Sequence, residues 1–369
     1  MTPSATAPPA PPALPCRCQQ AATPVHAYLY QMVEMGITRL FMERNIFDAI
    51  PEEGITVADL ATKTTSQFNI LERFVNFLIA SGVFTSPSAG YIAHTPISNL
   101  FQQKRLQLLY PHIYDCFMYS SVSWTTYFDK YGMQEPQQSN RSPFGLGFGY
   151  PDKTLYEIFD LLPERATAFN ATMALGLGEM PILGVYDFSW IGEYAKRPEA
   201  NGRTLFVDIG GGMGQALVAI LEENPAIPPS QCVLEDRESV IKDAEAAGGI
   251  LETVKKVPIS LFGEQPVKGS LVYYIRRVLN DWPDVEVVQM LSNVRKACAS
   301  DSKLLISENL LPDQPSLNLA AADVWLMNFG GKRRNERIFT EVAEKAGFKI
   351  SSIAKDSKTN SAVLELLPI

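Results

Sequence analysis

The feature that most constrains the fold is a glycine-rich segment placed directly after an apolar run. Residues 204–208 read Thr-Leu-Phe-Val-Asp, and residues 208–214 continue as Asp-Ile-Gly-Gly-Gly-Met-Gly before a stretch with helical periodicity. Glycines let the backbone turn tightly and approach a ligand closely. The segment therefore predicts a buried strand, a ligand-binding loop and a helix in succession.

The same alternation continues to the end of the chain. Apolar runs that predict strands lie at 231–235, 271–275, 303–307, 348–353 and 362–366, and helical patterns lie at 214–223, 238–246, 284–299 and 336–346. Strands alternating with helices predict an α/β fold with a doubly wound, mostly parallel sheet. The last two strands are joined by a polar hairpin, 355–361.

The N-terminal half has a different pattern. Helical periodicity over 23–101 ends in two short strand signals, 82–85 and 91–94, around a Ser/Pro/Gly turn, which predicts a winged helix. Its second helix carries Glu72 and Arg73 and no basic cluster, so we expect a dimerisation or lid role rather than DNA binding. Residues 106–186 are helical and aromatic-rich, which suits core or the wall of an apolar pocket.

We therefore expect four regions: a disordered Ala/Pro-rich tail at 1–20, a winged-helix-like dimerisation domain at 21–110, a helical substrate-pocket or linker region at 111–190, and a Rossmann-like domain at 191–369. The tail has no secretory pattern. No apolar run approaches the ~20 residues that span a bilayer. The net charge of −8 does not favour nucleic acid.

The cysteines do not form a metal-binding pattern. An odd number with scattered spacing indicates reduced thiols in a cytoplasmic protein without a zinc site. They are Cys16, Cys18, Cys116, Cys232 and Cys298.

Two acidic residues accompany the glycine loop. Asp208 precedes the first glycine and suits a cationic amino-acid group, whereas Asp236 ends the second expected strand, where a carboxylate can accept both hydroxyls of a ribose. The loop lacks the Gly-Lys-Ser/Thr ending of a triphosphate site. The alternative is a tight turn that binds no ligand.

Four motifs carry a specific resemblance: Val207–Gly214, Gln265–Gly269, Tyr274–Asp284 and Gly330–Lys332. With them, the chain from about Ala22 onward resembles fungal members of the plant-type, class I S-adenosylmethionine-dependent O-methyltransferase family. The resemblance implies an intertwined homodimer acting on a small molecule. It also implies cofactor contacts by Asp208, Gly210, Gly211, Gly212, Asp236, Ser260, Phe262 and Arg276.

The sequence departs from the family at the reaction site. The family's basic His is replaced by Asn280, and an amide cannot take a phenol proton at physiological pH. The three histidines, His26, His94 and His112, all lie outside the cofactor domain. Of two acids that orient the family's His, one remains as Glu308 and the other is Arg333.

A third departure concerns the adenine end of the cofactor site. Where the family has Asp before two aromatic or apolar residues, this chain has Ser260, followed by Leu261 and Phe262.

Three functions fit this pattern. With its base lost, the chain resembles the O-methyltransferase-like pericyclase offshoot of the fungal family, and this resemblance is the interpretation we favour. It implies dehydration of a polyketide or alkaloid intermediate, or its rearrangement by a Diels–Alder, hetero-Diels–Alder or Alder-ene reaction, with the cofactor bound but not consumed. The alternatives are a methyltransferase that acts by proximity or with another base, and a ligand-binding pseudoenzyme.

The candidate residues follow from the resemblance. Hydrogen-bond donors to a substrate carbonyl would be Arg333, Lys332, Asn280 and His112, with Asp281 and Glu308 completing the catalytic set. The substrate pocket would be lined by Phe144, Met173, Trp282, Trp325 and Met327, although each could equally be core, and Arg333 could be a solvated surface charge.

Overall fold

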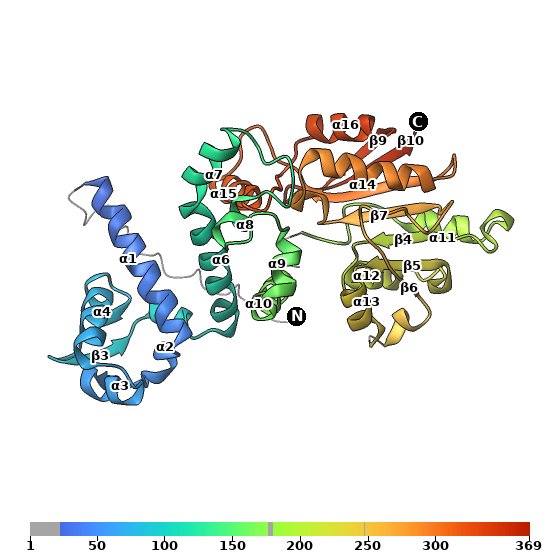
Figure 1. Ribbon diagram of the computed structural model, residues 1–369. Helices are drawn as coiled ribbons and strands as arrows, with labels where there is room; N and C mark the ends of the chain where they lie inside the picture. Colours follow the sequence, from blue (N-terminus) through green and yellow to red (C-terminus); the bar gives the residue numbers. More distant parts are fainter. Residues whose placement is uncertain (1–22, 176–179, 247) are drawn as a thin grey trace. The chain divides into compact units, whose positions relative to one another are not determined.

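The computed structural model describes residues 23–175, 180–246 and 248–369, with the side chains of 170–175 excepted (Figure 1). The chain divides into two compact units. The first comprises Met1–Cys116 and Glu164–Leu175, and the second comprises Phe117–Pro163 and Gly176–Ile369. Cys16 and Cys18 lie outside the described residues.

The first unit is a small helical domain with a three-stranded sheet. Its elements are α1 (Pro24–Glu43), α2 (Ile46–Ala49), β1 (Ile55–Thr56), α3 (Val57–Lys63), α4 (Phe68–Ala80), β2 (Phe84–Thr85), β3 (Tyr91–His94), α5 (Pro96–Leu100), the start of α6 (Lys104–Val122) and most of α10 (Pro163–Leu175). Strand β3 pairs antiparallel with β1 and β2. Helix and hairpin together confirm the winged-helix prediction.

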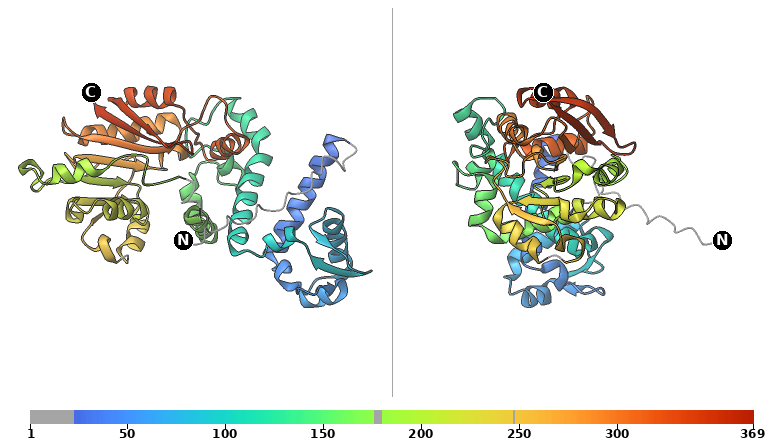
Figure 2. Two further views of the ribbon diagram at one scale, coloured as in Figure 1. Left: turned by 180° about the vertical axis from the view of Figure 1, so that it is seen from behind. Right: turned by 90° about the vertical axis from the view of Figure 1, so that its right-hand side faces the viewer.

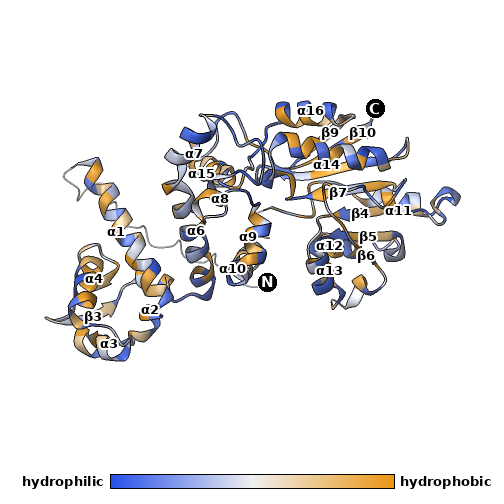
Figure 3. Ribbon diagram, viewed as in Figure 1, coloured by the Kyte–Doolittle hydropathy of each residue, from blue (hydrophilic) through white to orange (hydrophobic). Residues whose placement is uncertain are grey.

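Hydrophobic spacing explains why this unit folds. Helix α4 buries Leu71, Val75 and Leu78 on one face, and Figure 3 colours much of this helix as hydrophobic. These residues join Phe41 and Phe84 in a single core cluster.

The second unit contains a seven-stranded sheet in the order β6-β5-β4-β7-β8-β10-β9. The strands are β4 (Phe206–Ile209), β5 (Cys232–Asp236), β6 (Lys255–Pro258), β7 (Val272–Arg276), β8 (Lys303–Asn309), β9 (Phe348–Lys355) and β10 (Ser361–Pro368). The first five are parallel, and β10 pairs antiparallel with both β8 and β9. The C-terminal strands therefore form the predicted hairpin, visible beside the C-terminus in Figure 2.

Helices cover both faces of this sheet. One core cluster joins the strands to α14 (Asp284–Ala297) and α16 (Glu336–Lys345). The other joins them to α11 (Ser189–Ala195), α12 (Gln215–Glu223) and α13 (Glu238–Glu245). This two-sided covering is the doubly wound arrangement that the sequence predicts.

The remaining helices of this unit are α7 (Trp124–Tyr131), α8 (Pro143–Gly147), α9 (Leu155–Leu161) and α15 (Leu317–Met327). The sequence did not reveal β6, because its Lys-Lys-Val-Pro sequence lacks an apolar run, and it did not reveal α11 or α15. Among the residues that the structure describes, no helix is long and apolar enough to cross a membrane, and no cluster of ligating side chains could hold a metal ion.

Candidate cofactor and reaction site

The glycine loop connects β4 to α12, and at Gly210 and Gly211 its conformation and close packing leave no room for a side chain. Gly210 has φ of 69°, and a Cβ added there would lie 2.7 Å from Cγ2 of Val278. A Cβ on Gly211 would lie 2.5 Å from Oδ2 of Asp208. Left-handed φ and close packing therefore both require glycine, and they leave the loop backbone bare toward a ligand.

Asp208, which is buried, and Arg276, which is half-buried, lie beside this loop with unused hydrogen-bonding capacity. Asp208 is 1% exposed, and its Oδ2 accepts no hydrogen bond from any described residue. Burial raises the pKa of Asp208 to about 7, although the positive charge of Arg276 opposes this rise. Arg276 donates from Nη2 to the Met180 carbonyl at 2.6 Å, and its buried Nε has no partner among the described residues.

An acid and a guanidinium in this state suit a ligand that carries both an ammonium and a carboxylate. Burial also lowers the pKa of Arg276, which shows how strongly solvent is excluded there. Buried polar groups without partners are costly, so a zwitterionic amino-acid end that bonds to both would relieve that cost. The pair therefore fits the methionine end of S-adenosylmethionine.

Asp236 stands at the carboxyl end of β5 and is fixed by two backbone amides. Its Oδ2 accepts from the Gly212 N–H at 2.8 Å, and its Oδ1 accepts from the Arg237 N–H at 2.7 Å. The carboxylate is thus held at the mouth of the glycine loop, where the sequence places a ribose contact.

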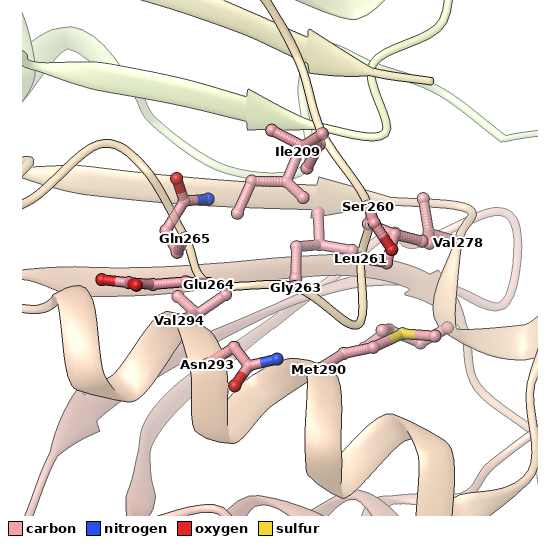
Figure 4. Close-up of a pocket in the computed structure, with 13 residues that line it drawn as sticks. Ile209, Ser260, Leu261, Gly263, Glu264, Gln265, Val278, Met290, Asn293 and Val294 are labelled. Carbon is pink, nitrogen blue, oxygen red and sulfur yellow. The ribbon is translucent and has the colours of Figure 1, made fainter. Parts of the chain in front are cut away.

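The expected adenine region is a small cavity of about 20 Å³ behind the loop that follows β6 (Figure 4). Ser260 and Leu261 line it from that loop, and Met290 and Asn293 line it from α14. This volume holds one water molecule but no ring. Phe262 lies at the same loop, with its ring edge-on to Trp282 at 5.0 Å between centroids.

Residues Leu279–Asp281 form one helical turn after β7 that carries the reaction-site positions. Glu308 on β8 is 1% exposed and holds this turn: Oε1 accepts from the Leu279 N–H at 3.1 Å, and Oε2 accepts from Nδ2 of Asn280 at 2.7 Å. Burial, reinforced by the negative charge of Asp281, raises the pKa of Glu308 to about 7. Each oxygen of Glu308 accepts a hydrogen bond from the turn, so this carboxyl orients residue 280.

Asn280 is held by the buried acid on β8. Its Nδ2 donates one N–H to Glu308, and its donation to a substrate carbonyl stays a prediction. Its Oδ1 is buried and has no hydrogen-bond partner among the described residues. A carboxylate can only accept here, so it selects the nitrogen of the amide and leaves the acceptor oxygen unused.

Asp281, the last residue of this turn, is half-buried, and the polar groups around it favour its ionised form. Burial raises its pKa to about 6, whereas a hydrogen bond from the Tyr156 hydroxyl and the positive charges of Arg277 and Arg333 oppose the rise. The Tyr156 hydroxyl donates to Oδ2 of Asp281 at 3.0 Å. The hydrogen bond and the two positive charges therefore hold the pKa of Asp281 below the value that burial alone would give.

The two predicted cationic donors are placed differently. Arg333 is half-buried, and its positive charge lowers the pKa of both Asp281 and Glu308, so it lies in the electrostatic environment of the site. Lys332 instead pairs its Nζ with Glu135 and with Asp284, each at 2.8 Å. Two carboxylates therefore engage its ammonium, and donation from Lys332 to a substrate stays a prediction.

Sequence reasoning missed the neighbouring Arg334, which is fully buried. Its Nη1 and Nη2 donate to the carbonyls of Leu279 and Trp282, and its Nε donates to Asp284, each at 2.7 Å. Arg334 thus fixes the backbone of the reaction-site turn from behind. Nothing in a run of two arginines distinguishes the buried one, so no sequence signal could have found it.

Gly331 lets the same segment approach the turn. A Cβ on Gly331 would overlap the Asn280 carbonyl oxygen, and the Lys332 N–H donates to that oxygen at 2.9 Å. The backbone of the Gly-Gly-Lys motif therefore packs directly on residue 280.

The five residues predicted to line the substrate pocket do not line a common cavity that the structure reveals, so their role stays a prediction. Phe144 is fully buried and packs on Phe148, Phe159 and Phe329, so it belongs to the core and cannot line a pocket in this structure. Trp282 is 7% exposed within the core cluster.

The other three predicted pocket residues are Trp325, Met327 and Met173. Trp325 and Met327 are half-buried on α15. The side chain of Met173 lies outside the described residues.

His112 belongs to the first unit, where its Nδ1 lies 3.6 Å from Sγ of Cys116. Burial lowers the pKa of His112 to about 4 and raises the pKa of the Cys116 thiol to about 12, so both are neutral at physiological pH. His112 is therefore a neutral imidazole, and its donation to a substrate carbonyl stays a prediction.

The fold and the loop geometry define a class I S-adenosylmethionine-binding protein. Residues 191–349 match the model of the O-methyltransferase domain, and residues 39–104 match the O-methyltransferase dimerisation domain. The chain is 68% identical to the methyltransferase pvhD of Talaromyces variabilis, over 97% of this chain and 99% of that protein. It is 58% identical to the methyltransferase fsa4 of Fusarium sp. strain FN080326, over 96% and 98%. The chain therefore belongs to this O-methyltransferase family.

Two solved structures share the fold. OxaC in complex with SAH and oxaline superposes with a TM-score of 0.83 at 22% identity, covering 96% of this chain and 89% of OxaC. LepI in complex with SAM superposes with a TM-score of 0.72 at 18% identity, covering 95% and 91%. The protein is an enzyme of methyltransferase fold, and its cofactor is S-adenosylmethionine.

Proposed function

We propose that this protein is a homodimeric methyltransferase that modifies a small-molecule acceptor group which is acidic enough to react without a strong base. The observation that carries the proposal is the cofactor cradle, in which bare glycine backbone lies beside the buried Asp208 and the half-buried Arg276. Each of these side chains has a buried atom without a hydrogen-bond partner among the described residues. The two relatives above, alike over almost the whole chain, bear the name methyltransferase.

The reaction site explains the kind of acceptor. Asn280 cannot accept a proton in the way a histidine does, and Glu308 is bonded through both oxygens to the turn that carries Asn280. An acceptor that is already ionised needs only to be held in line with the methyl group, and positioning alone lowers such a barrier substantially. When bound, S-adenosylmethionine supplies the methyl group: the acceptor's electron pair bonds to its carbon as the carbon–sulfur bond breaks, which leaves a neutral thioether.

The chain's own residues then have distinct parts. Asp208, Arg276 and Asp236 would hold the cofactor. Glu308 and Arg334 hold the turn of residues 279–281 in place. Asp281, whose pKa is raised to about 6, would take a proton from an acceptor that is still partly protonated.

A second candidate is the pericyclase that the sequence favours. It is supported by Arg333, a cation beside two carboxyls where the family has an acid, because a charged donor polarises a substrate carbonyl. In that case bonds reorganise within one substrate, and the cofactor is retained unchanged. The likeness to LepI concerns the fold alone and does not choose between the two functions.

The deciding experiment uses a metabolite extract from the source organism with this gene deleted. Purified protein is incubated with the extract and with cofactor that carries a deuterated methyl group, and products are identified by mass spectrometry. The proposal expects one labelled methyl group in a new product and formation of S-adenosylhomocysteine. An isomer or a dehydrated product without label would establish the pericyclase instead. Absence of any turnover would favour a non-catalytic ligand-binding protein.

A further inference from the structure

Helix α9 contacts both halves of the site through a single side chain, Tyr156. Its hydroxyl donates to Oδ2 of Asp281 at 3.0 Å, and its ring stacks on Trp282 with centroids 5.8 Å apart and planes 28° apart. The guanidinium of Arg237 lies 4.9 Å from the centre of the same ring. One tyrosine therefore contacts the reaction-site turn and the end of β5 together.

The contact with β5 leads directly to the cofactor-binding carboxylate. The Arg237 N–H donates to Oδ1 of Asp236 at 2.7 Å, and the Arg237 side chain pairs with Asp160 of α9 at 3.6 Å. The other oxygen of Asp236 accepts from the glycine loop. The path from glycine loop to Asp281 thus runs through Asp236, Arg237 and Tyr156 without a gap.

We propose that Tyr156 is a positioning residue, which orients the Asp281 carboxylate for the acceptor and holds it in register with the cofactor-binding end of β5. The inference rests on the proposed function, because it assigns the proton-accepting part to Asp281. Family position did not point to this tyrosine, which stands 125 residues before Asp281 in the chain.

The electrostatic surroundings of Asp281 show why the hydroxyl matters. The charged groups that face it are Arg277, which follows β7, Arg333, which follows α15, and Glu308 on β8. The two arginines favour the carboxylate, whereas Glu308 and burial oppose it. The Tyr156 hydroxyl is a neutral donor on the side of α9, so it stabilises the ionised form without adding charge.

The test replaces Tyr156 with phenylalanine, which keeps the ring on Trp282 and beneath Arg237 and removes only the hydroxyl. Loss of one hydrogen bond to a charged carboxylate should raise the Asp281 pKa by roughly one to two units. The acidic limb of the pH profile of kcat/KM should move upward by that amount, and cofactor affinity should stay within about twofold. Tyr156→Leu also removes the ring and should weaken cofactor binding in addition.

A matched control is Tyr127→Phe. Its hydroxyl donates to the Arg141 carbonyl at 2.9 Å in the same unit, so it loses a comparable hydrogen bond to a backbone group and should leave the pH profile unchanged. If Tyr156→Phe behaves like Tyr127→Phe in the pH profile, the positioning role is refuted.

A readout without turnover separates this inference from the proposed function. The Asp281 carboxyl carbon is titrated by NMR in ¹³C-labelled protein, with Asp281→Asn to assign its signal. A raised Asp281 pKa in Tyr156→Phe supports the contact even if the protein transfers no methyl group. An unshifted titration overturns the inference even if methyl transfer is found.

Discussion

Replacing Asp208 with asparagine should weaken binding of S-adenosylmethionine and remove most of the pH dependence that this residue gives to it. Asp208 is buried against the glycine loop with one unused oxygen, and burial raises its pKa to about 7. A cationic ligand group favours the ionised form, so binding and deprotonation of Asp208 are coupled. Asparagine keeps the shape and removes both the charge and the titration.

The magnitude follows from that pKa. If only ionised Asp208 binds well, wild-type affinity should be about twofold below its maximum at a pH equal to the pKa, and roughly tenfold below it one unit lower. A charge-assisted hydrogen bond contributes about 1.5–3 kcal/mol, so Asp208→Asn should bind roughly 10–150-fold more weakly at about pH 8.

The stability of the cofactor-free protein should change in the opposite sense. An acid whose pKa is raised by folding holds its proton more tightly in the folded state than in the unfolded state. Its contribution is therefore fully present below the unfolded pKa of about 4, and it is lost as the pH rises through about 7. Wild type should lose more free energy of unfolding than Asp208→Asn across that window.

Isothermal titration calorimetry between about pH 6 and about pH 8 measures the binding effect. The ligand's own ammonium titrates identically with both proteins, so their difference isolates Asp208. Glu235→Gln is the matched control: this buried acid also has a pKa raised to about 7 by burial, but it is bonded to Gln265 at 2.7 Å, so its loss should leave the pH dependence intact. Equal affinity of Asp208→Asn and wild type at the upper pH would refute the reasoning.

Three further outcomes are expected. Gly210→Val should bind S-adenosylmethionine too weakly to measure, because its side chain would meet Val278. The control Gly202→Val has a similar φ of 72° and open space around it, so it should still bind. Unchanged calorimetric affinity in Gly210→Val contradicts the assignment. Arg333→Met should slow turnover roughly 10–150-fold with unchanged cofactor affinity. Lys332→Met should mainly lower the melting temperature, because it breaks the ion pairs with Glu135 and Asp284. If both variants keep full rate and product ratio, neither residue acts on the substrate. Asn280→His combined with Arg333→Glu places an imidazole within reach of Glu308. This double variant should speed methyl transfer to a neutral phenol by roughly 100-fold or more, measured with labelled cofactor. A wild type that is already as fast would show that no base is missing.

The sequence by itself determined the features that depend on local spacing. Apolar runs and helical periodicity placed every strand of the second unit except β6, and helices α12, α13, α14 and α16, within a few residues. They could do so because burial of one face repeats at a fixed period along the chain. The glycines at 210–214 needed no partner to be recognised, because left-handed φ is a property of the residue itself. Asp208 and Asp236 could be named because each lies at the carboxyl end of an apolar run, close to the glycine loop or at the end of the next strand.

Tertiary structure alone decided what each polar side chain does. Arg333 and Arg334 are neighbours, yet one lies beside two carboxyls and the other is sealed behind the turn by three hydrogen bonds. Asn280 presents its oxygen only because Glu308 meets its nitrogen from another strand. Tyr156 reaches Asp281 across 125 residues. Hydrogen bonds and solvent exclusion depend on groups brought together from distant segments, and no pattern along the chain encodes which groups those are.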